Sequence, residues 1–315
     1  MGRKRRTKGK GKAKSILPLL VAVIFFCLGV LSAYLWDRFR EGTEPIVPEP
    51  IPAEAPTPEG RAQKPVPIPV HPPKPEKSWK AAIAIIIDDI GYKKKDVERF
   101  SSLPYPLALS IIPYTPFDVF SARYAKKHGK SVMLHIPMEP NHTSEIIEKL
   151  EKKTFGMLLT RMPDSTIRAM LKKELSRVPF AVAANNHMGS RFTQNRHKMR
   201  IVLNFLREHS LFFVDSRTSP KSVACSVGKS VGVVVLKRNI FLDNSKSKDY
   251  IKRQLDILAQ RALKRGYAIA IGHPHLATYQ ALMEKLPELE KRGVKVIPIE
   301  RIYQKVVEGE YEACL

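Results

Sequence analysis

The segment AAIAIIIDD (residues 81–89) consists of seven apolar residues followed by two aspartates. A continuous apolar run of this length is typical of a strand in a parallel sheet, because such strands are buried on both faces. In folds built from parallel strands, the carboxyl-terminal ends of the strands lie at one edge, where loops build the active site. We therefore expect Asp88 and Asp89, which close this run, to lie in a functional site.

Similar apolar runs recur along the chain, and segments with the apolar spacing of amphipathic helices separate them. Several helical segments end at a glycine, as expected for a helix C-terminal cap. This alternation predicts an α/β fold, and the absence of glycine-rich phosphate-binding motifs favours a barrel of seven or eight strands over a doubly wound sheet. The expected strands are 81–87, 107–112, 131–136, 180–184, 211–214, 233–236, 268–271 and 294–297, and the expected helices include 117–128, 164–177, 197–209, 248–265 and 279–292.

Five polar clusters follow such runs, and each contains a residue able to bind a metal or to move a proton. Because they follow expected parallel strands, they are expected to converge on one face of the barrel. Carboxylates and imidazoles gathered there from distant parts of the chain indicate a hydrolytic centre. The clusters are Ile87–Asp89, His135–Glu139, Asn185–Gly189, Asp215–Thr218 and Gly272–His275.

One carboxylate and two imidazoles at three of these strand ends form a candidate metal site. Asp89, His135 and His187 would leave open coordination positions, which suits a catalytic Zn²⁺ or another divalent metal. Glu139 is four residues after His135, so both could approach one metal from a helical turn or a tight loop. Asp88 would remain free as a base, because the metal stabilises the ionised form of the carboxylate beside it.

The first 76 of the 315 residues are expected to lie outside the folded domain. Residues 1–14 form a basic tail, and residues 15–36 form an apolar segment without charge that is long enough to span a bilayer. The positive-inside rule places the tail in the cytoplasm and the rest outside the inner membrane, in the periplasm. A cleaved signal peptide is the alternative, although its apolar region usually has only about 7–15 residues. Residues 37–76 hold about half of the chain's 25 prolines and form an expected linker, which leaves 77–315 as the barrel domain.

The net charge of +24 suggests an anionic partner. The expected topology and the absence of nucleic-acid motifs argue against nucleic acid. Acidic cell-wall polymer, lipopolysaccharide, a phospholipid surface and a merely solubilising role remain as alternatives. Cys225 and Cys314 are the two cysteines outside the expected membrane span, and a disulfide between them is conceivable in an oxidising compartment.

The five clusters, in this order along the chain, resemble the motifs of the polysaccharide deacetylase superfamily, and more closely its divergent branch of bacterial envelope proteins. The resemblance covers about residues 80–305 and implies a distorted, TIM-like (β/α)7 barrel. It implies that Asp88 is the catalytic base, that Asp89 and His135 bind a divalent metal, and that His273 is the general acid. Asp215 would orient a neighbouring catalytic group. The implied reaction is hydrolysis of an N-acetyl (or O-acetyl) group on an envelope polysaccharide or peptidoglycan.

The chain departs from the main family at two motifs. The family has a second histidine where this chain has Glu139, and an arginine-containing motif where this chain has residues 185–191. Our interpretation is that His187 becomes the third ligand and that Glu139 either binds the metal or orients a ligand. Arg191 is the candidate for the role of the missing arginine. Further candidates for contacts with ligands or substrate are Asn186, Arg217 and His275, the last of which could instead cap a helix.

Three functions fit these observations. The first is a membrane-tethered, metal-dependent deacetylase acting on an envelope glycan. The second is an inactive barrel that binds envelope glycan or an envelope protein partner without turnover. The third is a metal hydrolase that cleaves an ester or a phosphoester. Asp88 and His273 discriminate the first two functions, because a binding protein needs neither.

Overall fold

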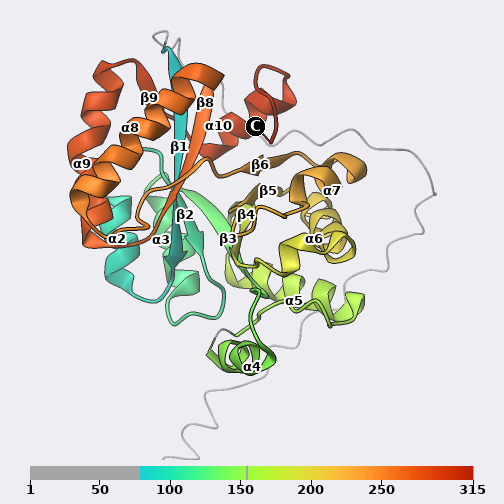
Figure 1. The fold of residues 1–315 in the computed structure, drawn as a ribbon. Coiled ribbons are helices and arrows are strands. Elements are labelled where there is room, and N and C mark those ends of the chain that lie inside the picture. Colours follow the sequence, from blue (N-terminus) through green and yellow to red (C-terminus); the bar gives the residue numbers. More distant parts are fainter. Residues whose placement is uncertain (1–78, 154, 315) are drawn as a thin grey trace, which may run out of the picture. The chain divides into compact units, whose positions relative to one another are not determined.

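The computed structural model describes residues 79–153 and 155–314, which form an α/β domain around one parallel sheet (Figure 1). The expected basic tail, membrane anchor and proline-rich linker lie outside these residues. Within them, no helix combines the length and the apolar character that crossing a membrane requires.

The described part of the sheet has nine strands, and every pairing between them is parallel. Each of the eight expected strands is present, and the two-residue strand β7 is an addition that its length hid from sequence reasoning. The strands are β1 (Ala81–Ile90), β2 (Ala108–Ile111), β3 (Ser131–Met138), β4 (Ala181–Met188), β5 (Phe212–Asp215), β6 (Val235–Lys237), β7 (Ile240–Phe241), β8 (Tyr267–Gly272) and β9 (Val294–Val296).

The five expected helices are confirmed as α3, α5, α6, α8 and α9. The glycines at 129, 266 and 293 have φ angles of 68°, 83° and 84°, as a helix C-terminal cap requires. The helices are α2 (Lys94–Ser101), α3 (Asp118–Lys127), α4 (Ser144–Lys153), α5 (Asp164–Arg177), α6 (Arg196–Glu208), α7 (Ala224–Val231), α8 (Lys248–Arg265), α9 (Leu276–Lys291) and α10 (Ile299–Val307), with a 3₁₀ turn, η1 (Phe192–Gln194).

The sheet curls toward a barrel but does not close. Its strand order is β6-β5-β4-β3-β2-β1-β8-β7, and β9 pairs with the beginning of β1. Helices α2, α3, α8 and α9 lie on the flank of β1 and β8, and α5, α6 and α7 lie on the flank of β4, β5 and β6 (Figure 1). No pairing joins the described end strands β6 and β7, so the fold is a curled, half-closed parallel sheet with an open seam between these two strands.

Alternation along the strands separates two apolar cores. In β1, Ile83 and Ile85 pack into the core beneath the outer helices, whereas Ala84 and Ile86 belong to the core on the concave face. The concave core also contains apolar side chains of α10, such as Ile302, so this helix covers part of the concave face. Polar side chains occupy the carboxyl-terminal end of the same face, where α10 does not reach.

The end of β1 is shaped so that two successive aspartates serve one site. Its pairing with β2 shifts register between Ile87 and Ile90, and Asp89 has a φ of 57°. A residue in the left-handed conformation interrupts the alternation of side chains along a strand. For a residue other than glycine, this conformation costs on the order of 1–3 kcal/mol. Gly91 follows with a φ of 122°, and a Cβ there would lie 2.1 Å from Thr115 Oγ1. The strained turn at the end of β1 is thus held by close packing.

A disulfide joins Cys225 in α7 to Cys314, 89 residues later, so the pairing that the sequence left as conceivable is present. Closing a loop of this length restricts the unfolded chain and stabilises the fold by about 4–5 kcal/mol in the chain-entropy model. We expect the double variant Cys225→Ser, Cys314→Ser to lose free energy of unfolding of this order in urea titrations. Reduction of the wild-type protein should give the same loss, and an unchanged unfolding midpoint after reduction would contradict the expectation.

Glu174 in α5 is fully buried, and neither of its carboxylate oxygens has a hydrogen-bond partner among the described residues. Burial raises its pKa well above the ordinary value of 4.5. The folded state therefore keeps a proton that the unfolded chain releases, and stability declines as pH rises above this ordinary value. We expect Glu174→Gln to remove this decline, so that urea titrations give it a higher free energy of unfolding than the wild type at pH 8. At pH 4 the difference should shrink, and exposed Glu148→Gln should show no such pattern.

Candidate metal and catalytic site

Polar side chains from several strands line the carboxyl-terminal end of the concave face. In β1, the alternation that places Ala84 and Ile86 on the concave face continues to Asp88. In β4, the same spacing of two residues places Asn185 and His187 on this face. His135 in β3 pairs in register with Asn185 in β4. The strand ends therefore bring these residues together, although up to 99 positions separate Asp88 from His187 in the sequence.

Asp89, His135 and His187 form a group that could hold a metal ion, because one ligand atom from each lies within 4.8 Å of the others. Asp89 Oδ1 is 3.2 Å from His135 Nε2 and 2.9 Å from His187 Nδ1. These are the three residues that the sequence predicted as ligands. One carboxylate and two imidazoles form a donor set that is typical of catalytic zinc.

The two neighbouring histidines together outweigh the effect of burial on the pKa of Asp89. Burial alone would raise the pKa of its carboxyl, but hydrogen bonds and charge from His135 and His187 hold it well below the ordinary value. For His135 the balance is reversed: burial lowers its pKa, and the charges of Asp88 and Asp89 outweigh that effect and raise it. Two carboxylates facing two imidazoles thus favour a positive charge between them, which a divalent cation would supply.

Asn185 organises both the metal ligand and the candidate base. Its Oδ1 accepts hydrogen bonds from His135 Nδ1 at 2.8 Å and from the Ser110 hydroxyl at 2.6 Å. Its Nδ2 donates to Asp88 Oδ1 at 2.8 Å. A proton held on His135 Nδ1 leaves the Nε2 lone pair facing Asp89, as a metal ligand requires. Sequence reasoning named the adjacent Asn186 and missed Asn185.

Asp88 lies beside the metal-binding group without belonging to it. It is 3% exposed, and its Oδ2 is 3.5 Å from His135 Nε2. Burial raises the pKa of Asp88 above its ordinary value, and the neighbouring charge of Asp89 adds to the rise. A carboxylate with a raised pKa next to a metal site is suited to accept a proton.

His273 faces the group from the other side, at the end of β8. Its Nε2 is 4.0 Å from Asp89 Oδ2, and its Nδ1 donates to Asp243 Oδ1 at 2.9 Å. Burial alone would lower the pKa of His273, but the hydrogen bond and charge of Asp243 raise it to about 9. The second oxygen of Asp243 accepts from the His273 backbone at 2.6 Å and from Thr278 at 2.8 Å. Asp243 therefore fixes this imidazole with its Nε2 toward the site.

Asp243, which no sequence motif indicated, is the carboxylate that orients His273. In the described part of the chain, the carboxylate hydrogen-bonded to His273 belongs to Asp243, whereas Asp215 Oδ1 accepts from the Arg217 backbone at 2.8 Å. Asp243 sits in a loop after β7 whose sequence has no alternation, so no pattern marked it. Asp215 is buried, and burial raises its pKa although the charges of Arg217 and Arg238 oppose the rise. Its expected role of orienting a neighbouring catalytic group stays a prediction.

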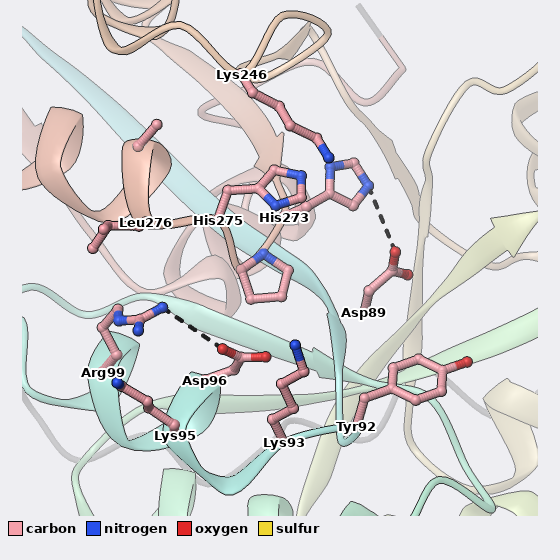
Figure 2. A pocket seen from close by; sticks show the side chains of 12 residues that line it. Asp89, Tyr92, Lys93, Lys95, Asp96, Arg99, Lys246, His273, His275 and Leu276 are labelled. Atoms are coloured by element: carbon pink, nitrogen blue, oxygen red, sulfur yellow. Dashed lines mark ion pairs between the residues drawn. The ribbon is translucent and has the colours of Figure 1, made fainter.

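A cavity of about 840 Å³ opens beside Asp89 and His273 (Figure 2). Lys93 and Lys246 enter it from opposite sides, and Tyr92 lies next to Asp89. His275 is the N-terminal cap residue of α9, but its side chain forms no capping hydrogen bond. The side chain lines this cavity instead. The cavity could therefore take a polar ligand, with an anionic part near the lysines and its reacting atoms at Asp89.

Glu139 and Arg191 contact each other outside the group that could hold a metal. Glu139 Oε2 accepts from the backbone and the hydroxyl of Thr160 at 2.7 and 2.6 Å, and Arg191 Nε is 3.4 Å from its other oxygen. Glu139 is outside the group that could hold a metal. Its carboxylate instead binds Thr160 in the loop after α4 and contacts Arg191. That Arg191 takes the role of the missing arginine stays a prediction.

Two other predicted residues support the loop after β5. Asn186 points away from His187 and its Oδ1 accepts from the Ser216 backbone at 2.9 Å, while its Nδ2 donates to Met188 at 2.7 Å. Arg217, with a φ of 53°, offers its backbone oxygen to Arg238 at 3.1 Å. Arg238 is the arginine whose charge reaches Asp88. Sequence reasoning missed it because it follows the short strand β6 without a motif.

Comparison with known proteins agrees with this geometry. Residues 85–303 match the family described as divergent polysaccharide deacetylase. The chain belongs to this family. Its similarity to Escherichia coli (strain K12) YibQ is 34% identity over 207 residues, or 66% of this chain and 63% of YibQ. An uncharacterized Haemophilus influenzae (strain KW20 / Rd) protein is 36% identical over 209 residues, covering 65% and 72% of the two chains.

A solved structure shows the same fold in another divergent sequence. The uncharacterized protein ATU2773 from Agrobacterium tumefaciens C58 superposes with a TM-score of 0.68 at 19% identity, over 73% of this chain and 92% of that one. The half-closed sheet is therefore shared with a distant protein.

Proposed function

We propose that this divergent polysaccharide deacetylase is a metal-dependent hydrolase that removes N-acetyl (or O-acetyl) groups from an envelope glycan such as peptidoglycan. The observation that carries the proposal is the placement of Asp88 and His273 around the group formed by Asp89, His135 and His187. A base and an acid beside three metal ligands are the parts that amide or ester hydrolysis needs.

The donor set of the three ligands fits a divalent metal, with Zn²⁺ the best match. The Asp89 carboxylate and the two imidazoles would hold it, and the hydrogen bond of His135 Nδ1 to Asn185 fixes the tautomer that binding requires. When bound, such a metal polarises a carbonyl oxygen and makes water more acidic.

The chain's own residues would then manage the protons. Asp88, held by Asn185, would accept the proton of the attacking water. His273, held by Asp243, would present a proton on Nε2 to the departing amine or alcohol. The two groups stand at the ends of the neighbouring strands β1 and β8, so one can remove a proton while the other delivers one.

We further propose that the domain works in the periplasm, carried by residues 15–36 as a single membrane span with its N-terminus inside. The disulfide between Cys225 and Cys314 supports this location, because such bonds persist in oxidising compartments. A C-terminal alkaline phosphatase fusion should be active in cells, because this reporter folds only after export. An inactive, stably produced fusion would contradict the location.

The test of the activity combines metal content with acetate release. The full chain should contain close to one divalent metal per molecule and release acetate from acetylated peptidoglycan or from N-acetylglucosamine oligomers. A chelator should stop the release, and added Zn²⁺ should restore it. A metal-loaded protein that binds these glycans but releases no acetate, with binding unchanged in Asp88→Asn, would instead support the inactive barrel that binds glycan or a protein partner.

A further inference from the structure

A second cavity lies at the seam where the sheet stays open, away from the metal-binding group. It has a volume of about 350 Å³ and lies between the strand ends of β5 and β6 and the C-terminal part of α8. Small-molecule sites start at about this size. No acidic side chain lines it, and five of the residues that do are cationic: Arg217, Lys237, Arg238, Arg261 and Arg265. We call these five residues the seam cluster.

The cations of the seam cluster form no direct ion pair with a described carboxylate, although the charge of the buried Asp215 acts on Lys237 and Arg238. None of the ion pairs in the described part of the chain involves them. The side chains of Arg217, Lys237 and Arg265 form no hydrogen bond with any described residue. Elsewhere on the same surface, Lys248 and Lys252 pair with Glu284, and Arg292 pairs with Asp256, so the seam cluster departs from the usual local pairing.

The cations repel one another at close range. Burial lowers the pKa of Lys237, and the charges of Arg217 and Arg265 lower it further. Burial also lowers the pKa of Arg238 to about 10, the charge of Asp215 opposes this decrease, and the charges of Arg217 and Arg261 add to it. An anion placed among these side chains would relieve the repulsion, which is a source of binding energy that a solvated surface lysine does not offer.

Two of the four guanidinium groups in the seam cluster are held in place. Arg238 donates to the backbone oxygens of Ser216 at 2.7 Å and Arg217 at 3.1 Å, and its guanidinium carbon lies 3.6 Å from the centroid of the Phe241 ring. Arg261 donates to the backbone oxygen of Asn239. Positioned donors lose little conformational entropy when a ligand binds, and the planar guanidinium matches the oxygens of phosphate.

We propose that the seam cluster binds a phosphate group, either as free phosphate or as a phosphomonoester on a sugar. A carboxylate carries one negative charge and two acceptor oxygens, so it would leave most of the five cations uncompensated. A phosphomonoester carries nearly two charges and three acceptor oxygens. The proposal is independent of deacetylation, because none of the three expected metal ligands lines this cavity.

The test is isothermal titration of the full, metal-loaded chain with inorganic phosphate at constant ionic strength. The variant Arg261→Gln, Arg265→Gln removes two cations from the cavity, and Arg253→Gln, Lys264→Gln removes two exposed cations from the same helix as a matched control. Loss of one charge-assisted contact weakens binding by roughly tenfold. We expect at least that loss in the first variant and wild-type affinity in the control.

Three outcomes would overturn the proposal: phosphate binding no stronger than that of chloride, equal losses in both variants, or undiminished binding in the Arg261→Gln, Arg265→Gln variant. The last outcome would place phosphate on the metal instead. A parallel titration with glucosamine 6-phosphate distinguishes the source. Tighter binding than inorganic phosphate assigns the cavity to a phosphorylated sugar, and equal binding assigns it to the free anion. Acetate release is measured separately, so failure of either proposal leaves the other standing.

Discussion

Replacement of Asp88 by asparagine is expected to lower the rate of acetate release by about 10²–10⁴-fold, the usual contribution of a general base. The substitution keeps the shape of the side chain and keeps an oxygen that can accept from Asn185 Nδ2. It removes the ability to take up a proton. Because the buried Asp88 carboxyl is unfavourable in its charged form, a neutral amide should not destabilise the fold.

Metal analysis and acetate release on the same sample check this expectation. The metal content should stay at the wild-type level, because Asp88 is outside the group of three ligands. Asp249→Asn, which removes an exposed carboxylate at the start of α8, is the control and should keep full activity. Wild-type rates in Asp88→Asn would exclude this residue as the base.

Alanine at His135 or at His187 is expected to abolish stoichiometric metal binding and with it the activity. Each substitution leaves two of three protein ligands, which is too few to hold zinc in competition with water. The two variants should differ in stability, because His135 is 2% exposed and its removal also deprives Asn185 of a hydrogen bond. His187 is more accessible, so its variant isolates the loss of the metal.

Elemental analysis after dialysis measures the bound metal, and circular dichroism checks that each variant is folded. His142→Ala is the matched control, since His142 is exposed in the loop after β3 and lies outside the group that could hold a metal. Retention of one metal per chain in His187→Ala would show that this histidine is not a ligand. The same result in both variants would refute the three-residue site.

The fold and the three metal ligands could be predicted from the sequence because both depend on short-range patterns. Apolar runs marked eight of the nine strands, and Asp89, His135 and His187 stand where such runs end. Alternation could also have identified Asn185, since a residue two positions before His187 in a strand must share its face. By the same rule, Asn186 faces away from His187.

The remaining site residues depend on long-range geometry that local patterns do not record. Asp243 reaches His273 because β7 and β8 bring a loop back to the end of β8, and a two-residue strand leaves little trace in a sequence. The charge interaction between Arg238 and Asp88 connects the ends of β6 and β1, which no local pattern in the sequence records. Barrel closure was also overestimated, since apolar runs predict strands but do not show whether the first and last strands of a curled sheet meet.

The position of Asn185 has a consequence for how this site can change. One amide serves both the residue that would hold the metal and the residue that would take the proton, through His135 and Asp88. Perturbations of these two residues should therefore be non-additive, with a coupling energy that disappears when the amide is removed. A substitution that changes the metal affinity of the site through Asn185 should therefore also change the basicity of Asp88. The two properties should change together in evolution.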